Sequence, residues 1–165
     1  MSERIFAYGS NMCSGRFREY GVTPEEKGRA ALLVGYRLRF NKKSQKDGSG
    51  KANVEPHEGG QVWGVLYTIP EKDLRLLDDG EKGYSPLKLA VLINGLATDA
   101  WVYVASSPDN DPGLRPYSWY KRFLVEGARE HAVSPEYIAE LEQIDATQDK
   151  NTKRDREKRS IACRS

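Results

Sequence analysis

The stretch LKLAVLINGLATDAWVYVA, residues 87–105, carries the clearest folding signal in the chain. Two runs rich in apolar and β-branched residues, 87–93 and 98–105, flank Asn94 and Gly95. Asn-Gly is strongly favoured in a two-residue hairpin turn, because both turn positions need a positive φ. The stretch therefore predicts two antiparallel strands joined by a tight turn.

Further strand patterns precede this hairpin. Residues 5–8 form a short apolar run, and residues 30–40 partly alternate between apolar and polar side chains, which predicts one long, bent strand. Residues 52–55 and 61–69 predict two more strands. Gly64, inside the last of these, indicates a bulge or a close approach by another group.

The remaining segments predict loops and helices. The polar residues 41–50 predict a mobile loop. Ser134, as N-cap, and Pro135, at the first helical position, open the last helical pattern. The helical patterns cover residues 71–78, 117–131 and 134–144.

The order of these elements predicts the fold class. About six strands and a few short helices, grouped instead of alternating with the strands, favour an α+β domain on a mainly antiparallel sheet that could close into a barrel. A doubly wound parallel fold does not fit. We expect one folded domain over residues 1–146 and a charged, flexible tail over residues 147–165.

The composition fits one globular domain. The chain has 165 residues, of which 38% are hydrophobic, which suffices for a single core. Its longest aliphatic runs are far shorter than the ~20 residues of a membrane helix, so no membrane partner is expected. The N-terminus shows no secretory pattern, which predicts a cytoplasmic protein. Cys13 and Cys163 form no disulfide framework or zinc pattern, and both are expected to be reduced thiols.

Charge is concentrated at the C-terminus. Residues 150–165 hold seven Lys or Arg and two Asp or Glu, a net of +5, which leaves residues 1–149 at −3 out of the total of +2. The body is therefore not a basic nucleic-acid module. The tail could touch nucleic acid weakly through phosphates, or form a solvated helical or disordered end.

The turn after the first strand is the first candidate site. In Tyr8-Gly9-Ser10-Asn11, the glycine allows close backbone approach, and the following N–H groups can converge on an anion such as a carboxylate. An ordinary turn with a helix cap is the alternative interpretation of these four residues.

Glu81 is the second candidate. It follows a predicted helix within Leu77-Asp78-Asp79-Gly80-Glu81, and apolar neighbours could raise its pKa toward that of a general base. A solvated acidic loop is the alternative.

Other residues give weaker signals. His57 and His131 are far apart, and no phosphate-loop or dinucleotide motif is present, so neither a metal nor an organic cofactor is expected. Tyr103 and Tyr120 could be plain core aromatics.

Four short segments occur in order along the chain, namely IFAYGSNM at 5–12, VWGVLY at 62–67, LDDGE at 77–81 and AWVY at 100–103. A helical pair from Pro116 onward follows them. Taken in order, these segments resemble the γ-glutamylcyclotransferase family, including its AIG2-like and γ-glutamylamine cyclotransferase branches, and the resemblance spans about residues 3–145.

The resemblance implies a small, mainly antiparallel β-barrel flanked by helices, and an enzyme that needs no metal or organic cofactor. Such an enzyme acts on a small γ-glutamyl substrate, whose α-amine attacks its own γ-carbonyl and releases 5-oxoproline with an amine or amino acid. The catalytic acid/base of the family falls on Glu81. The implied substrate-binding residues are Phe6, Ala7, Tyr8, Gly9, Ser10, Asn11, Tyr103 and Tyr120.

The chain departs from the family pattern beside Glu81. Most relatives have Gly directly after the catalytic Glu, whereas here Lys82 intervenes and Gly83-Tyr84 follow at once. The glutathione-degrading branch usually has Leu where this chain has Asn11, so Asn11 favours the general or amine-type branch. A catalytically silent module that binds γ-glutamyl metabolites remains the alternative function. The oligomeric state stays open.

Overall fold

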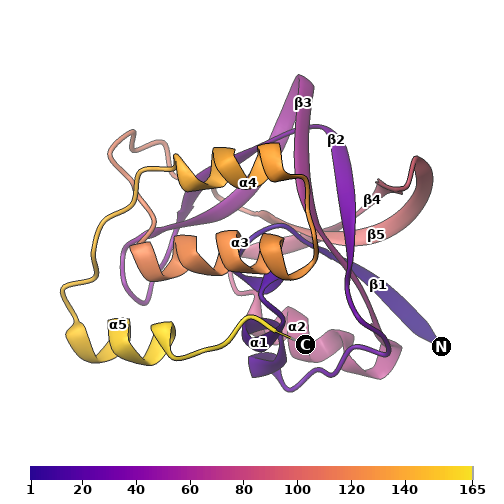
Figure 1. Cartoon of the computed structure of the whole chain (residues 1–165), viewed down its shortest axis with the longest axis horizontal. Coiled ribbons are helices and arrows are strands. Elements are labelled where there is room, and N and C mark those ends of the chain that lie inside the picture. The colour runs from indigo at the N-terminus through magenta and orange to yellow at the C-terminus, as the bar shows by residue number, and fades with distance from the viewer. Residues whose placement is uncertain (165) are drawn as a thin grey trace.

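The computed structural model describes residues 1–164, and its centre is a closed five-stranded barrel (Figure 1). The strand order is β1-β3-β2-β4-β5, and every pairing is antiparallel except the parallel contact of β1 with β5 at Ile5 and Trp101. This confirms the α+β class and the mainly antiparallel sheet. The strands are β1 (Ser2–Ala7), β2 (Arg29–Lys43), β3 (Gly50–Pro70), β4 (Tyr84–Ile93) and β5 (Leu96–Ala105).

The predicted hairpin is present as β4 and β5. Asn94 and Gly95 have φ of 49° and 81°, as a two-residue turn of this kind requires. The two strands predicted over residues 52–55 and 61–69 form a single strand, β3. The chain between them stays paired with β2, across a register shift between Val34 and Tyr36. The structure therefore has five strands in the described chain instead of about six.

Of two local predictions about β2 and β3, one is wrong in its bounds and the other is confirmed. The loop predicted over residues 41–50 shrinks to residues 44–49, because β2 continues to Lys43 and β3 begins at Gly50. The close approach predicted at Gly64 is confirmed, since a Cβ there would lie 2.5 Å from the carbonyl oxygen of Ala7. That close contact lies where β1 pairs with β3, at the end of β1 that leads into the predicted site loop.

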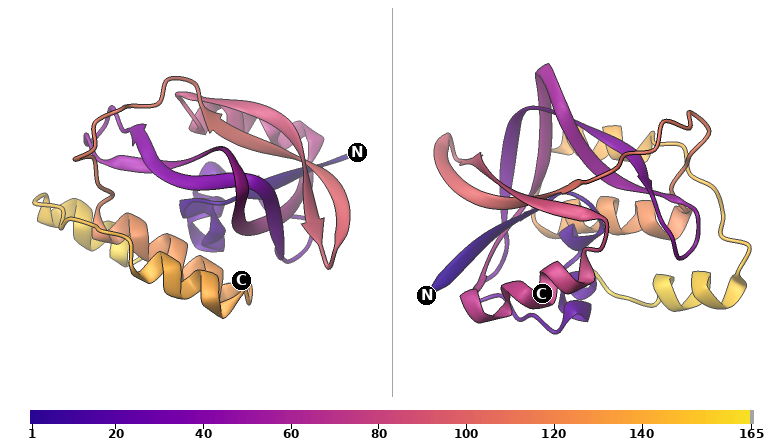
Figure 2. Two further views of the ribbon diagram at one scale, coloured as in Figure 1. Left: turned by 90° about the horizontal axis from the view of Figure 1, so that it is seen from above. Right: turned by 180° about the vertical axis from the view of Figure 1, so that it is seen from behind.

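The helices gather in two groups around the barrel. Helices α3 (Ser118–Glu130) and α4 (Pro135–Glu142) cover one side, whereas α1 (Ser14–Phe17) and α2 (Leu74–Gly80) lie together near one end (Figure 1 and Figure 2). Short 3-10 turns, η1 (Ser10–Met12), η2 (Arg18–Tyr20) and η3 (Glu71–Asp73), adjoin α1 and α2. None of the helices in residues 1–164 has the length and apolar character needed to cross a membrane.

Helix α3 supplies much of the core. Its buried face carries Trp119, Phe123 and Leu124, which are at most 1% exposed. Burial of side chains of this size contributes about 1.5–3 kcal/mol each. The N-terminal end of α3 thereby fixes Tyr120, which reaches toward the loop after β1.

The C-terminal segment corrects two predictions. Residues 152–159 form helix α5 (Thr152–Arg159), which runs beside α3 (Figure 2). Asp149, 2% exposed, accepts from Trp119 Nε1 at 2.9 Å and from Arg154 Nη2 at 2.7 Å. The flexible tail predicted from residue 147 is therefore wrong for the described residues, because a buried carboxylate anchors it.

A disulfide joins Cys13 to Cys163, so the prediction of two reduced thiols is also wrong. The two cysteines are 150 residues apart in sequence, and only the path of the segment after α5 brings them together. Gly15 permits that path, since a Cβ there would lie 2.1 Å from the carbonyl oxygen of Ala162. Arg122 Nη2 also donates to the carbonyl of Ile161 at 3.0 Å.

Candidate active site

The predicted site residues meet in one cavity of about 710 Å³ at the end of the barrel where β1 stops. The turn after β1, the turn after α2, strand β5 and helix α3 each supply part of its wall. The structure brings together all nine predicted residues: Phe6, Ala7, Tyr8, Gly9, Ser10, Asn11, Glu81, Tyr103 and Tyr120.

Glu81 reaches the cavity because α2 ends directly before it. Its N–H donates to the Leu77 carbonyl at 2.8 Å, which closes the last turn of the helix. One carboxylate oxygen, Oε1, accepts from Asn11 Nδ2 at 2.9 Å and from the Tyr20 hydroxyl at 3.2 Å. In the described chain no donor contacts Oε2, so one oxygen is fixed and the other is left for proton exchange.

The environment of Glu81 changes the pKa of its carboxyl. Burial raises this pKa, while the hydrogen bonds from Tyr20 and Asn11 and the charges of Arg16 and Lys42 oppose the rise. A raised pKa makes the carboxylate a stronger base, which suits a group that takes and returns a proton. The solvated acidic loop considered as an alternative does not describe this site.

Tyr20 is a site residue that the sequence interpretation missed. Its ring lies against Gly80, where a Cβ would come within 2.1 Å of the ring carbon Cε1. Burial and the neighbouring Glu81 carboxylate raise the pKa of Tyr20, so its hydroxyl stays a donor. No local pattern marks Tyr20, because η2 and α2 meet only in the folded chain.

The loop after β1 presents backbone donors to the cavity. The N–H groups of Met12 and Cys13 donate to the carbonyls of Gly9 and Ser10, whereas those of Ser10 and Asn11 have no protein acceptor in the described residues. Gly9 is tightly enclosed, since a Cβ there would lie 3.2 Å from the Tyr120 hydroxyl. The geometry fits the anion-binding loop predicted from the sequence.

Tyrosines form the rest of the wall. The Tyr120 hydroxyl accepts from the Ala52 N–H at 3.0 Å, and the Tyr84 hydroxyl donates to the Ala52 carbonyl at 2.8 Å. Tyr8 donates to the Tyr103 carbonyl, and Tyr103 donates to Asp78 Oδ1, both at 2.5 Å. Tyr103 and Tyr120 therefore line the cavity with their hydroxyl groups already engaged.

Basic side chains of the cavity wall were also missed. Arg16, Lys42, Lys46 and Lys51 line it. Burial lowers the pKa of Lys51 to about 8, against the opposing effect of its ion pair with Asp47. These residues come from α1, from the ends of β2 and β3 and from the loop between those strands, so their convergence depends on tertiary structure.

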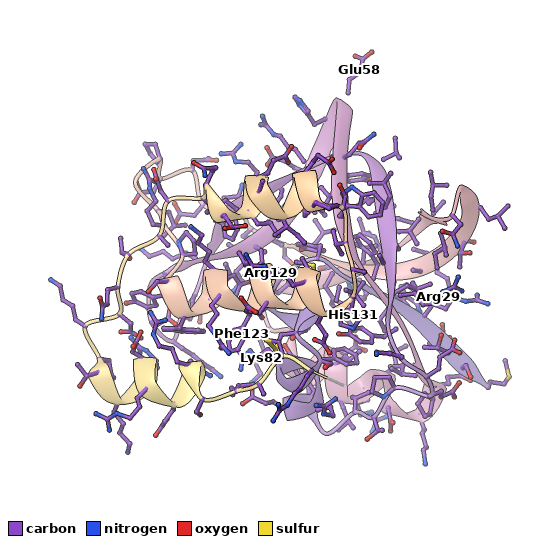
Figure 3. All side chains as sticks on the ribbon, viewed as in Figure 1. Arg29, Glu58, Lys82, Phe123, Arg129 and His131 are labelled. Atoms are coloured by element: carbon purple, nitrogen blue, oxygen red, sulfur yellow. A yellow bond between two sulfur atoms is a disulfide. The ribbon has the colours of Figure 1, made fainter. Side chains whose placement is uncertain are left out.

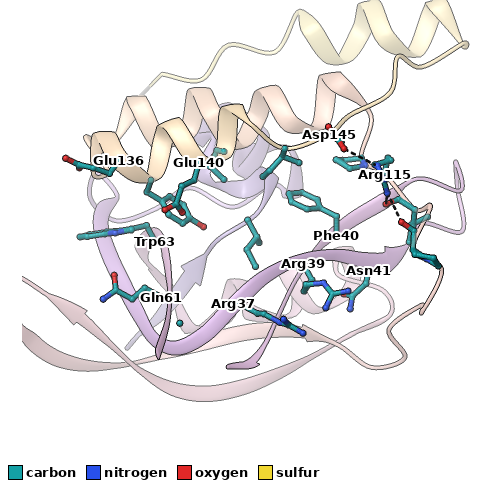
Figure 4. Close-up of a pocket in the computed structure, with 18 of the residues that line it drawn as sticks. Arg37, Arg39, Phe40, Asn41, Gln61, Trp63, Arg115, Glu136, Glu140 and Asp145 are labelled. Atoms are coloured by element: carbon teal, nitrogen blue, oxygen red, sulfur yellow. Dashed lines mark hydrogen bonds and ion pairs between the residues drawn. The ribbon is translucent and has the colours of Figure 1, made fainter. Parts of the chain in front are cut away.

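A second cavity, of about 820 Å³, lies between the β2–β3 pair and α4 (Figure 4). Trp63 contributes to its wall, Glu136 and Glu140 line it from α4, and Arg115 pairs with Asp145 at 3.9 Å at one end. None of the nine predicted site residues lines this cavity.

Comparison with known proteins supports the family resemblance that was identified from the sequence. A model of the AIG2-like family matches residues 61–141. A human protein named "Gamma-glutamylcyclotransferase" is 26% identical over 149 residues, which cover 85% of this chain and 77% of the human protein. These matches support the γ-glutamylcyclotransferase and AIG2-like family for this chain.

Solved structures extend this likeness within the γ-glutamylcyclotransferase and AIG2-like family. One named "Gamma-glutamyl cyclotransferase" superimposes with a TM-score of 0.81, covers 92% of each chain and is 24% identical, and it therefore shows a shared fold. YkqA from Bacillus subtilis is 27% identical with a TM-score of 0.75, and the match covers 98% of this chain and 55% of that one. The predicted γ-glutamylcyclotransferase-like fold is confirmed.

Proposed function

We propose that this chain is a cyclotransferase that releases 5-oxoproline from a γ-glutamyl amino acid or γ-glutamyl amine, with Glu81 as the general acid/base. The observation that carries the proposal is the position of Glu81. Its partly buried carboxylate is held through one oxygen by Asn11 and Tyr20, in the same cavity as the backbone donors of the loop after β1. Curated relatives bearing the name gamma-glutamylcyclotransferase support an enzymatic role.

The loop after β1 would bind the glutamyl end of the substrate. The free N–H groups of Ser10 and Asn11 are suited to the α-carboxylate, because oriented backbone donors stabilise an anion. With that end fixed, the α-amine and the γ-carbonyl of the same molecule can be held in a near-attack shape. Such positioning supplies several kcal/mol of rate acceleration.

Glu81 would move the protons. Its carboxylate takes a proton from the α-ammonium, and the freed amine forms a C–N bond to the γ-carbonyl carbon. When the tetrahedral intermediate collapses, the original C–N bond breaks and Glu81 returns its proton to the leaving nitrogen. Glu81 then takes the second proton from the ring nitrogen, which becomes the lactam N–H, and passes it to the released amine, so that the carboxylate is restored. The products are 5-oxoproline and the free amine, and no oxidant, reductant or water is consumed.

Product analysis with Glu81→Gln tests the proposal. The nearly isosteric amide cannot accept a proton, so 5-oxoproline release should fall by at least about a hundredfold while the fold is kept. Glu58→Gln is the matched control, because Glu58 projects from the far end of the β2–β3 pair, away from Lys82 beside the site (Figure 3).

Three other outcomes would contradict the proposal. Glutamate as the product would indicate hydrolysis, and turnover of an N-acetylated substrate would exclude the α-amine as nucleophile. Binding of γ-glutamyl compounds without any turnover would favour the silent binding module. The cytoplasmic location and the weak nucleic-acid contact of residues 150–165 stay predictions.

A further inference from the structure

Four cationic side chains gather in and beside the active-site cavity. Lys51 Nζ lies 4.4 Å from the centre of the Trp119 ring and 4.6 Å from that of Tyr120. Lys158 Nζ, from α5, lies 5.4 Å from the same Trp119 ring. We call Arg16, Lys46 and Lys51, which line the cavity, the cationic subsite, with Lys158 as its outer member.

Carboxylates of the chain balance only part of this charge. Lys51 pairs with Asp47 at 3.2 Å, and Arg16 pairs with Glu19 at 2.5 Å. Within residues 1–164, no carboxylate oxygen lies within 4.0 Å of the Nζ atom of Lys46 or of Lys158. Burial and then the charge of Arg16 lower the pKa of Lys158, as expected where like charges crowd together. Two positive charges are therefore available to a ligand.

Tyr120 separates this subsite from the loop after β1. Its hydroxyl lies beside Gly9 and the Ala52 N–H, whereas its ring faces Lys51. The cavity thus has two places that favour anions, one of backbone donors and one of cationic side chains. A γ-glutamyl compound bound by its glutamyl end at the loop would direct its leaving group toward the cations.

We propose that the cationic subsite selects substrates whose leaving group is an acidic amino acid, with a side-chain carboxylate in addition to its α-carboxylate. The proposal rests on the cyclotransferase function proposed above. A simple amine has no carboxylate, so it would pair with neither unbalanced cation. A neutral amino acid has only its α-carboxylate, which would pair with one. A leaving group with two carboxylates can neutralise both.

The C-terminal segment takes part in this selection. Lys158 is carried by α5, which is fixed on one side by Asp149 and on the other by the Cys13–Cys163 disulfide. Because Cys13 directly precedes α1, which carries Arg16, the disulfide joins the two elements that bring Arg16 and Lys158 to the subsite.

Two dipeptides that differ by one charge test the proposal. γ-Glutamyl-glutamate and γ-glutamyl-glutamine share every group except the side-chain carboxylate or amide of the leaving residue. At low ionic strength we expect kcat/KM for 5-oxoproline release to be about tenfold higher for the glutamate compound, with the ratio falling as salt is added. γ-Glutamyl-ethylamine should be the poorest substrate of the three.

Matched variants locate the effect. Lys46→Met and Lys158→Met should bring the ratio of the two kcat/KM values toward one. The controls are Lys43→Met, which changes an exposed lysine of β2 outside the cavity, and Lys153→Met, which changes an exposed lysine of α5. Both controls should keep the wild-type ratio. Because the ratio in the unmodified protein is decisive by itself, a variant that fails to fold leaves the test intact.

The outcomes separate this proposal from the one on which it rests. Equal kcat/KM for the two dipeptides, with 5-oxoproline formed from both, would overturn the acidic selectivity and leave the cyclotransferase function standing. No 5-oxoproline from any γ-glutamyl compound would overturn the function. In that case calorimetric binding of the two dipeptides decides the subsite, and equal affinities would refute it.

Discussion

The side-chain amide of Asn11 donates to the Glu81 carboxylate at 2.9 Å, which ties the turn after β1 to the turn after α2. These turns are 70 residues apart in sequence. The contact links the loop proposed to bind the substrate with the group proposed to move its protons, so that a shift in either turn alters both. Substitutions that remove single contacts test how strongly the fold and the site depend on each of them.

Asn11→Ala should change the pH dependence of turnover. The variant loses one of the two donors to Glu81 Oε1, and because that hydrogen bond lowers the carboxyl pKa, its loss raises the pKa of Glu81 further. The acidic limb of the kcat/KM profile should move to higher pH, and kcat at neutral pH should fall about tenfold. Asn110→Ala, at an exposed loop amide, should leave the profile in place. Identical profiles for wild type and Asn11→Ala would show that this contact does not tune Glu81.

Gly80→Ala should damage the site through Tyr20. The new Cβ would lie 2.1 Å and 2.2 Å from two carbons of the Tyr20 ring, so the ring must move and its hydroxyl must leave Glu81. Overpacking of this kind costs about 1–3 kcal/mol of stability. We expect lower kcat and lower Tm, with Gly113→Ala, where a Cβ would meet only Asp111 at 3.2 Å, as the control. Wild-type kcat in Gly80→Ala would refute the role assigned to Tyr20.

Asp149→Asn should destabilise the protein in a pH-dependent way. Its hydrogen bonds with Arg154, followed by those from Trp119 and the Asn151 N–H, lower the pKa of Asp149 to about 2 despite burial. A folded-state pKa below the unfolded value contributes stability above about pH 4, and that stability is lost as the pH falls through about 2.

Urea unfolding of wild type and Asp149→Asn at several pH values measures this effect. The variant should be less stable by about 1–3 kcal/mol at pH 7, and the gap should narrow between about pH 4 and pH 2. A gap that stays constant down to pH 2 would mean that the loss arises from packing and not from the carboxylate charge.

Cys163→Ser should lower stability by about 2–4 kcal/mol, because the disulfide restricts the unfolded chain by closing a long loop. Denaturant unfolding of the oxidised wild type and the variant measures the difference. Reduction of the wild type should reproduce the stability of Cys163→Ser, and the same reductant should leave the variant unchanged. A titration that finds two free thiols in the native, unreduced wild type would contradict the disulfide.

Local sequence determined the elements whose signals lie within a few residues. Asn94 and Gly95 set the β4–β5 hairpin because their positive φ values leave few alternatives. Pro135 begins α4 because its fixed negative φ suits the first helical position, although the Ser134 side chain makes no capping hydrogen bond. The segments around Tyr8 and Glu81 marked both halves of the candidate site, and the family resemblance decided between these and the alternative interpretations.

Tertiary structure alone decided the rest. Tyr20 meets Glu81 across 61 residues and Cys13 meets Cys163 across 150, and Lys51 and Lys158 come together only on the Trp119 ring. Local patterns report backbone preference and the face that a side chain takes, but carry no signal for which distant faces will pack together. Burial of the shared core decides which distant faces pack together. Tertiary contacts also hold the charged C-terminal segment in place, although its own composition indicated a flexible tail.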